Sequence, residues 1–517
     1  MKRYRAVLVL GGREVESVEQ VHHTKVMIVG SGGNGMAVAV LLEQAGFSDF
    51  LIVTKHDDFG GAWWQNTYPG CAVDGPISVY QFSFALNPEW PRLYAAQPEL
   101  AAYMQKVAAD HGLYEHTHFR TEMLEAEWLE EPACWSVTTT GGTYHAEVLV
   151  LATGFLEEAV VPDIVGMDSF QGRIFHSSMW PEGYTGEGDR VAVVGTGSSS
   201  IQIVSAMQQV AAAVTMFQRT PCWIVPKQDK VFSDEDRARF RDTPELLLEM
   251  RRELSEEQEV VWDDVFLLKD VAASDAAQAE ALQYLEEQVP DPELRLLLTP
   301  DHRFACKRPG VSDTYYRALQ QDNVELVPEA ASRIGPTTIA SAGGREFEAD
   351  TVVLATGFFF GGHILHRVRR RDGVTVGEAQ QGHPRAYRSI SVSGCPNLFL
   401  IGGAAPNGQN WNGLSAGEIA GVYVVKALEY MQEHGIRALE VGQDAEAAWK
   451  READKVLDAS PMVSGGCANY SLDELGHNKA AWPGNEGHMS AALSEFDASV
   501  YLVVATWTDD RGIPAAN

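Results

Sequence analysis

Two glycine-rich segments carry the clearest chemical signal in this chain of 517 residues. The first, at 30–35, contains four glycines: Gly30, Gly32, Gly33 and Gly35. In such a motif one glycine makes a tight turn, another lets the backbone approach a pyrophosphate, and a third lets a helix pack on a strand. The segment follows an expected strand, 25–29, and precedes an expected helix, 36–44, so the phosphates would meet a helix N-terminus, which favours anions. We therefore expect a dinucleotide-binding fold here.

A second glycine-rich segment indicates a second nucleotide. It lies between an expected strand, 190–194, and an expected helix that opens at Ile201. Its residues are Gly195, Thr196, Gly197, Ser198, Ser199 and Ser200. Ser200 replaces the third glycine of the motif, but a small residue still permits close packing of helix on strand. Two such folds in one chain usually mean one permanent cofactor and one diffusing reductant.

The flanking residues indicate which nucleotide each fold binds. Arg219 and Thr220 follow the next expected strand of the second fold, where an NAD site would usually offer an acid to the ribose. A guanidinium suits a 2′-phosphate instead, so the second fold is expected to bind NADPH. After the first fold, 60–70 reads GGAWWQNTYPG. Glycines such as Gly61 allow close approach to a flat ring system and tryptophans such as Trp63 could shield it from water, so we expect FAD there.

Three segments resemble the Baeyer–Villiger monooxygenase family, and the resemblance extends over nearly the whole chain. They are the fingerprint FxGxxxHxxxW with a following proline, here Phe170, Gly172, His176, Trp180 and Pro181; the segment from the paired glycines to Asp74; and Lys307–Arg308 ahead of 313–316. Relatives that oxidise nitrogen or sulfur usually carry Tyr or Phe in place of the Trp-Pro pair. The resemblance implies an FAD- and NADPH-dependent enzyme that uses O2 to convert a small-molecule ketone to an ester or lactone through a flavin 4a-peroxide.

The resemblance also implies roles for single residues. Arg308 is the expected catalytic arginine, because a permanently charged, planar donor stabilises anions well in a water-poor site. Asp74 is expected to orient Arg308. Lys307 is expected to contact the 2′-phosphate together with Arg219, and it would face the opposite way from its neighbour Arg308.

Further residues are expected to contact the cofactors or couple them. His176 and Trp180 are interpreted as coupling the linker between the two folds to the positioning of NADP. Tyr80 and Trp411 are expected to wall the flavin or the substrate. One position departs from the family pattern, because Thr54 stands where a glutamate commonly holds the FAD ribose. A hydroxyl can still bond the ribose but supplies no charge, so the ribose anchor is expected to be weaker or to use another group.

The organisation expected from these anchors is an α/β fold of two interleaved Rossmann-like domains with a helical insertion. Repeated Ala-Thr-Gly turns, at 152–154 and 355–357, indicate where the chain crosses between the domains. The expected segments are an N-terminal extension at 1–24, the FAD domain at 25–159 and 385–517, the NADPH domain at 160–226 and 303–384, and an acidic helical insertion at 227–302.

Composition and cysteine spacing argue against several other classes of protein. A net charge of −31 disfavours nucleic acid or an anionic membrane surface as a partner. None of the six cysteines forms a CxxC pair, which argues against a disulfide framework, a zinc site and a disulfide reductase. No stretch approaches the ~20 apolar residues of a membrane helix, and we expect a cytoplasmic protein with no bound metal.

Two alternatives stay open from the residues alone. A nitrogen- or sulfur-oxidising enzyme could use the same scaffold, although the Trp180–Pro181 pair and Arg308 speak against it. A non-oxygenating flavoprotein reductase is the other alternative, and Thr54 is the only residue that favours it.

Overall fold

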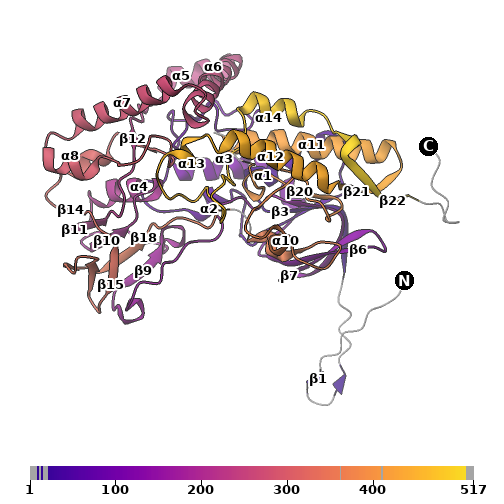
Figure 1. The fold of residues 1–517 in the computed structure, drawn as a ribbon, viewed down its shortest axis with the longest axis horizontal. Helices are drawn as coiled ribbons and strands as arrows, with labels where there is room; N and C mark the ends of the chain where they lie inside the picture. Colours follow the sequence, from indigo (N-terminus) through magenta and orange to yellow (C-terminus); the bar gives the residue numbers. More distant parts are fainter. Residues whose placement is uncertain (1–8, 11–12, 15–20, 361–362, 409–411, 508–517) are drawn as a thin grey trace.

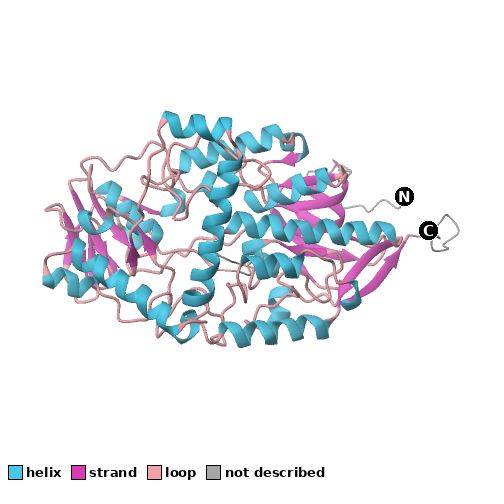
Figure 2. Cartoon of the chain, turned by 90° about the horizontal axis from the view of Figure 1, so that it is seen from above, coloured by secondary structure: helices cyan, strands magenta, loops and turns pink. Residues whose placement is uncertain are grey.

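The computed structural model describes residues 9–10, 13–14, 21–360, 363–408 and 412–507 (Figure 1). Within these residues two groups of strands lie toward opposite ends of the molecule, with helices around and between them (Figure 2). The first sheet has the order β19 (Val368–Arg369), β6 (Met123–Leu129), β7 (Cys134–Thr139), β8 (Gly142–Leu151), β3 (His22–Val29), β4 (Phe50–Val53) and β5 (Thr117–His118), with β20 (Leu398–Leu400) paired to β8. The second has the order β14 (Val324–Val327), β11 (Ala213–Phe217), β10 (Arg190–Val194), β18 (Thr351–Leu354) and β9 (Arg173–His176).

The remaining elements are shorter sheets and covering helices. The strands are β1 (Val9–Leu10), β2 (Arg13–Glu14), β12 (Ile224–Val225), β13 (Gly310–Val311), β15 (Ala331–Ile334), β16 (Thr338–Ser341), β17 (Glu346–Glu348), β21 (Ile436–Val441) and β22 (Tyr501–Thr506). The helices are α1 (Gly33–Gln44), α2 (Ala62–Gln65), α3 (Gln97–Asp110), α4 (Ser198–Met207), α5 (Asp234–Asp242), α6 (Glu245–Val261), α7 (Val271–Gln288), α8 (Pro292–Leu298), α9 (Tyr315–Ala318), α10 (Val376–Gln380), α11 (Gly413–Glu433), α12 (Gln443–Leu457), α13 (Pro461–Ser464) and α14 (Glu486–Leu493).

The first sheet is built on a fully buried central strand. Residues 26–29 of β3 are all buried, as expected of a parallel strand that is covered on both faces. The strand begins at His22 rather than at the expected Lys25, because His22 already pairs with Tyr144 of β8. Helix α1 follows directly and packs against α11. This strand-turn-helix unit places the first glycine motif at the carboxyl end of the sheet.

The second sheet repeats this arrangement with parallel strands. Strand β10 pairs with β11 on one side and with β18 on the other. Helix α4 begins at Ser198, earlier than the expected Ile201, because Gly197 is already its extended N-cap residue. Ser198 and Ser199 therefore contribute backbone N–H groups to the first turn, where such groups have no partner within the helix. Together the two sheets confirm the expected α/β fold with two Rossmann-like domains.

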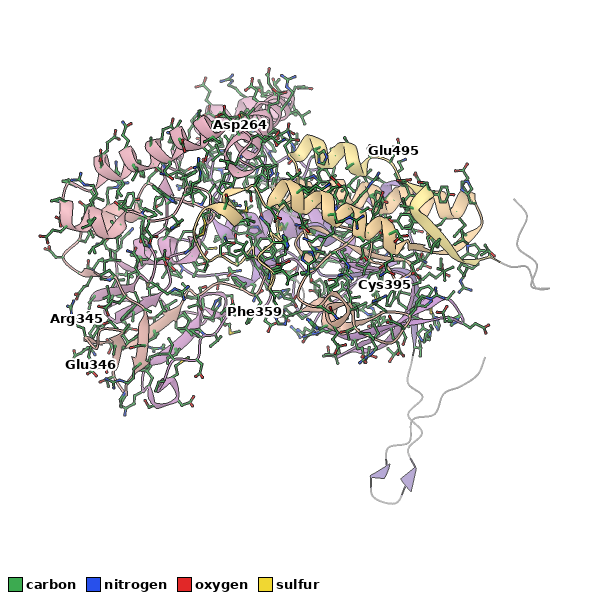
Figure 3. The ribbon with its side chains drawn as sticks, in the orientation of Figure 1. Asp264, Arg345, Glu346, Phe359, Cys395 and Glu495 are labelled. Atoms are coloured by element: carbon green, nitrogen blue, oxygen red, sulfur yellow. A yellow bond between two sulfur atoms is a disulfide. The ribbon has the colours of Figure 1, made fainter. Side chains whose placement is uncertain are left out.

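The chain returns to the first domain earlier than the expected boundary at 384. After β18, strand β19 pairs with β6 of the first sheet. Ile364, Leu365, Val368 and Val376 are buried in the core beneath that sheet. Burial of these apolar side chains therefore assigns 364–384 to the first domain. Phe359, which precedes this return, lies between the two halves of the molecule (Figure 3).

Helices α5 to α8 occupy the expected acidic insertion and run along one edge of the molecule (Figure 1). Leu247 of α6 is buried in the core of the first domain, and Leu246 and Met250 pack against that core. Leu285 of α7 is buried in the core of the second domain. The insertion therefore contacts both dinucleotide domains through apolar side chains.

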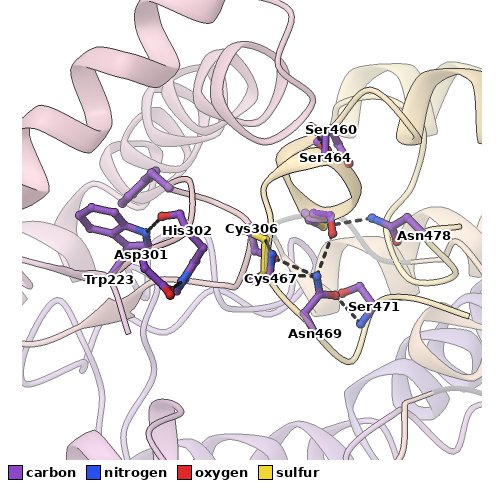
Figure 4. The surroundings of a disulfide bond; sticks show 12 residues. Trp223, Asp301, His302, Cys306, Ser460, Ser464, Cys467, Asn469, Ser471 and Asn478 are labelled. Carbon is purple, nitrogen blue, oxygen red and sulfur yellow. Dashed lines mark hydrogen bonds and ion pairs between the residues drawn. A yellow bond between two sulfur atoms is a disulfide. The ribbon is translucent and has the colours of Figure 1, made fainter. Parts of the chain in front are cut away.

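The cysteines depart from the sequence expectation. Cys306 and Cys467, which are 161 positions apart, form a disulfide bond (Figure 4). The fold brings their Cα atoms to 6.1 Å, a separation that a disulfide can span. The sequence argued against a disulfide framework and did not predict this single bond, because cysteine spacing along the chain does not report pairs that tertiary structure brings together. Cys71, Cys134, Cys222 and Cys395 are free.

Candidate active site

A cavity at the carboxyl end of the first sheet collects most of the residues expected to bind FAD. Its lining includes Gly30, Gly32, Gly33, Thr54, Gly61, Trp63 and Tyr80. Gly30 has φ +118°, and a Cβ atom there would lie 2.5 Å from the carbonyl oxygen of Ala152. Gly35 does not line the cavity; a Cβ atom on it would lie 2.0 Å from the Gly30 oxygen. The motif therefore needs glycine at both positions to keep α1 close to β3.

The polar groups around this cavity suit a dinucleotide. Gly32 caps α1 without a side-chain hydrogen bond, so backbone N–H groups of the first turn are directed at the cavity. The Thr153 hydroxyl, which also belongs to the lining, is buried and has no hydrogen-bond partner among the described residues. A buried polar group normally has a partner, and a ligand would supply one here.

Thr54 stands where the family commonly has a ribose-binding glutamate. Its hydroxyl oxygen accepts hydrogen bonds from the Ser31 hydroxyl at 2.9 Å and from the His56 backbone at 3.3 Å. Thr54 is thus part of a buried network at the cavity edge. Lys55 forms an ion pair with Glu157 at 3.1 Å, and both residues line the same cavity. Glu122 lines the cavity as well, so the structure brings two carboxylates from outside the motif to a cavity that lacks the usual acid.

Arg308 and Asp74 do not line this cavity, but they form a two-point ion pair close enough to Tyr80, a lining residue, to affect its pKa. Arg308 donates from Nε to Asp74 Oδ2 at 3.0 Å and from Nη2 to Oδ1 at 3.1 Å. Burial alone would raise the pKa of Asp74, but the charge and hydrogen bonds of Arg308 outweigh it and lower that pKa. The charge of Asp74 in turn raises the pKa of Arg308. Both groups are charged at neutral pH, and the pair fixes the plane of the guanidinium.

Trp63 and Tyr80 form an aromatic wall close to this ion pair. The indole of Trp63 donates to the Tyr80 hydroxyl at 3.0 Å, and the two rings meet edge to face with centroids 5.7 Å apart. Burial raises the pKa of Tyr80 to about 12, and the negative charge of Asp74 acts in the same direction. Tyr80 is therefore protonated at neutral pH and can donate a hydrogen bond.

The second glycine motif has the same backbone design. Gly195 has φ +126°, and a Cβ atom there would lie 2.2 Å from the Ala355 carbonyl oxygen. Gly197 is different, because a Cβ atom there would meet no heavy atom within 4 Å among the described residues. Thr196 fixes the turn by donating to the Thr220 carbonyl at 2.9 Å. The open space at Gly197 fits the close approach of a pyrophosphate to the backbone.

Two cations lie together at the edge of the second fold. Burial lowers the pKa of Lys307, and the positive charge of Arg219 lowers it further, which reports that the two groups are close. The neighbouring Arg308 binds Asp74 instead. Lys307 and Arg308 thus serve different partners, as their adjacent positions predict. Two neighbouring cations are well suited to a phosphate group.

The fingerprint residues His176 and Trp180 connect backbone segments. His176 Nε2 donates to the Gly357 carbonyl at 3.0 Å, and its Nδ1 accepts from the Ser178 backbone at 3.2 Å. Burial lowers the pKa of His176, so the ring is neutral at neutral pH. Trp180 donates to the Tyr184 carbonyl at 3.0 Å and lines a cleft against α2 and α3. Their expected effect on NADP positioning stays a prediction.

Two side chains near the ion pair were not found from the sequence. Tyr470 is about half exposed, yet desolvation of its hydroxyl raises its pKa, and the charge of Arg308 acts in the opposite direction, which places the phenol near that guanidinium. Lys227 is close enough to Asp74 for its charge to lower the pKa of that carboxyl. Neither position has a motif around it. Trp411, which was expected to wall the site, lies outside the described residues.

The described residues contain neither a metal-ligating cluster nor a membrane-spanning helix. No group of three or more metal-ligating side chains comes together there. In the same part of the chain, no helix has the length and apolar character that crossing a membrane requires.

Comparisons with known proteins identify the family. A family model described as pyridine nucleotide-disulphide oxidoreductase matches residues 27–235. The chain is 36% identical over 506 residues to a Baeyer–Villiger monooxygenase of Streptomyces coelicolor, covering 96% of each. It is also 36% identical over 491 residues to a Baeyer–Villiger monooxygenase of Pseudomonas aeruginosa, covering 94% of this chain and 92% of that one.

Solved structures agree with these relatives. A cyclohexanone monooxygenase from Rhodococcus sp. Phi1 bound to NADP+ aligns with a TM-score of 0.82 at 25% identity, covering 92% of this chain and 97% of that one. An oxidized steroid monooxygenase bound to NADP aligns with a TM-score of 0.82 at 28% identity, covering 93% and 99%. The chain belongs to the Baeyer–Villiger monooxygenase family, and the expected family and enzyme class are confirmed.

Gly197→Ala tests whether the second motif approaches a nucleotide. The added methyl group meets open space, so the fold should be unchanged, but it would occupy the place that the motif leaves for a pyrophosphate. We expect the Kd for NADPH to rise on the order of tenfold with FAD content unchanged. Gly35→Ala is the matched variant, because its methyl would collide with backbone and should reduce FAD retention. Flavin absorbance per protein measures FAD content, and titration measures the Kd for NADPH. Normal NADPH binding by Gly197→Ala would contradict the assignment of this motif to the nucleotide.

Proposed function

We propose that this chain is a flavin-dependent Baeyer–Villiger monooxygenase that binds FAD in the first domain and NADPH in the second. The observation that carries the proposal is the two-point Arg308–Asp74 ion pair beside the first cavity. A ketone, O2, NADPH and a proton become an ester or lactone, NADP+ and water. The family relatives support this activity, and the structures that resemble the chain include one described as a complex with FAD and NADP.

The bound flavin supplies hydride acceptance from NADPH and activation of dioxygen, which no side chain can supply. The protein must stabilise negative charge on oxygen, first on the attacking oxygen and then on the attacked ketone carbonyl. Arg308 supplies a permanent positive charge for both events, and Asp74 keeps its guanidinium in a fixed plane. Fixed charge is most effective where water is excluded. The side chains of Arg308 and Asp74 are 39% and 29% exposed in this structure, so bound nucleotide and ketone would have to displace water from them.

The second domain selects and positions the reductant. Gly195 and Gly197 form the turn for the pyrophosphate, and Arg219 and Lys307 would hold the 2′-phosphate. His176 ties strand β9 to the crossing turn at Gly357, so the fingerprint would connect nucleotide binding to the geometry between the domains. We place the enzyme in the cytoplasm, where NADPH is available as a reductant.

Oxygen-18 labelling tests the proposed reaction. We expect purified holoenzyme with NADPH, 18O2 and a panel of cyclic and linear ketones to form an ester or lactone with one labelled oxygen atom. Sulfides and amines serve as competing substrates, because a heteroatom oxidase would label those instead. Flavin reduction by NADPH with hydrogen peroxide as the sole oxygen product for every ketone would contradict the proposal.

Arg308→Ala tests the role of the ion pair. We expect FAD binding and flavin reduction by NADPH to persist, because neither glycine motif is altered. Ester formation should fall at least about 10²- to 10³-fold, the loss typical of one oxyanion donor, with hydrogen peroxide released instead. Arg308→Lys is the control that keeps the charge but loses the two-point contact. Its rate of ester formation should lie between the rates of the unmodified enzyme and of Arg308→Ala. Unchanged ester formation in Arg308→Ala would overturn the assignment.

Arg219→Ala tests nucleotide selection. The guanidinium would bind the 2′-phosphate that distinguishes NADPH from NADH, so its removal should weaken NADPH binding alone. A charge-assisted hydrogen bond contributes about 1.5 to 3 kcal/mol, which corresponds to about a 10- to 150-fold loss of preference. The ratio of kcat/KM for the two nucleotides measures this. Equal losses with NADPH and NADH would show that Arg219 has a structural role instead.

A further inference from the structure

The Cys306–Cys467 disulfide lies directly beside the catalytic arginine of the proposed reaction. Cys306 immediately precedes Lys307 and Arg308, and Cys467 lies shortly before Tyr470. Figure 4 shows the bond joining the loop that follows the helical insertion to the segment that follows α13. None of the roles described above uses this bond.

We propose that the Cys306–Cys467 disulfide is a redox-dependent positioning element that holds Arg308 and the 465–470 segment together at the substrate site. This inference rests on the proposed function. When the bond is intact, NADPH oxidation is coupled to ketone oxygenation. When it is reduced to two thiols, the two segments separate and more of the activated oxygen leaves as hydrogen peroxide.

The 465–470 segment holds the loop before Arg308 through several hydrogen bonds. The Arg303 backbone donates to the Gly465 carbonyl at 3.0 Å, and Asn469 Nδ2 donates to the Cys306 carbonyl at 3.1 Å. The Cys467 backbone N–H contacts Cys306 Sγ at 3.1 Å. Gly465 has no space for a side chain here, because a Cβ atom would lie 2.8 Å from Cys306 Cβ. The two segments are therefore closely fitted around the disulfide.

The loop also adopts a backbone conformation that needs support. Ala305 has φ +63°, a left-handed conformation that alanine rarely adopts, and it is fully buried. Such a conformation persists where the surrounding structure enforces it. Phe304 and Ala305 are anchored in an apolar cluster, and the bond at Cys306 fixes the next residue before Lys307 and Arg308 turn toward their partners.

The 465–470 segment is partly exposed to solvent. Gly466, Ala468 and Tyr470 are exposed, so few apolar contacts hold this stretch in place. The Tyr470 ring stacks on Phe360 with centroids 5.4 Å apart, and its phenol is close enough to Arg308 to affect its pKa. Without the covalent bond, the position of Tyr470 would depend on the hydrogen bonds of Asn469, the Arg303–Gly465 backbone hydrogen bond and the ring contact with Phe360. Displacements of this kind matter, because about 1 Å at a reacting centre can cost about 100-fold in rate.

The redox chemistry balances with ordinary cellular reagents. Hydrogen peroxide takes two electrons from the two thiols, so that one S–S bond forms and two water molecules are released. A dithiol reverses this: its thiolate attacks the Cys467 sulfur, Cys306 leaves as a thiolate, and the second thiol completes exchange. Cys467 is the more accessible of the two, since Cys306 is 1% exposed. Disulfides in reducing compartments are usually transient and redox-sensing, which fits this assignment.

The test compares oxidised and reduced holoenzyme. Titration of the denatured protein should give four thiols before treatment with a dithiol reductant and six after it, because the chain has six cysteines and four are free. Reductant is then removed anaerobically, and NADPH consumed, ester formed and hydrogen peroxide released are measured. We expect unchanged flavin reduction, a higher KM for the ketone and a fall in ester per NADPH on the order of tenfold. Reoxidation should restore the original amount of ester formed per NADPH consumed.

Variants separate the bond from general effects of reductant. Cys467→Ser cannot form the bond and should behave like the reduced enzyme under both conditions. Cys134→Ala alters a buried free cysteine of β7 and should respond to reductant as the unmodified enzyme does. Retained FAD shows that each variant is folded.

The outcomes distinguish this inference from the proposed function. Equal ester per NADPH in the four-thiol and six-thiol forms would overturn the positioning role and leave the proposed function intact. Six thiols even after treatment with hydrogen peroxide would show that the bond does not form and would also overturn it. Absence of ester in both forms, with normal flavin reduction, would contradict the proposed function, and the inference would fail with it.

Discussion

The Arg308–Asp74 ion pair is the interaction on which the active site depends. It joins two residues 234 positions apart, one in the loop after α2 and one after the helical insertion. Its two hydrogen bonds fix the orientation of the guanidinium, and its charge balance keeps both groups ionised at neutral pH. A single arginine without this partner would have many orientations, and fixed orientation is what makes a charge catalytically effective.

The two dinucleotide folds set the position of this ion pair. Each fold places a glycine turn at the carboxyl end of a parallel sheet, as Gly30 and Gly195 show by their positive φ values and close carbonyl contacts. The crossing turns that follow β8 and β18 lie against these glycines, since Ala152 and Ala355 supply those carbonyls. The same turns that shape the nucleotide sites therefore determine how the domains meet. The insertion packs on both cores and completes this arrangement.

Local features of the site were predictable from the sequence, because they depend on neighbouring residues. The glycines of both motifs, the strands before them and the fold class follow from short patterns of turn and apolar residues. Arg308 and Asp74 were found through family motifs, and their direct contact was then observed. Helix starts were less accurate, since Gly197 caps α4 ahead of the apolar pattern that begins at Ile201.

Features that depend on distant parts of the chain were not predictable. The Cys306–Cys467 bond, Tyr470 and the early return of 364–384 to the first sheet all arise from tertiary contacts. A cysteine carries the same local signature whether it is free or paired. The strand at 368–369 is too short to show periodicity, and its burial depends on the sheet that it joins.

A double-mutant cycle on Arg308 and Asp74 tests the central claim most directly. Ester formed per NADPH and the rate of ester formation would be measured for Arg308→Ala, Asp74→Ala and the double variant under conditions where flavin reduction is complete. If the two residues act as one unit, the double variant is no slower than Arg308→Ala, because Asp74 acts only through the arginine that it holds. If the fold-loss in the rate of ester formation in the double variant equals the product of the two single losses, the account is contradicted, because the two residues would then act independently.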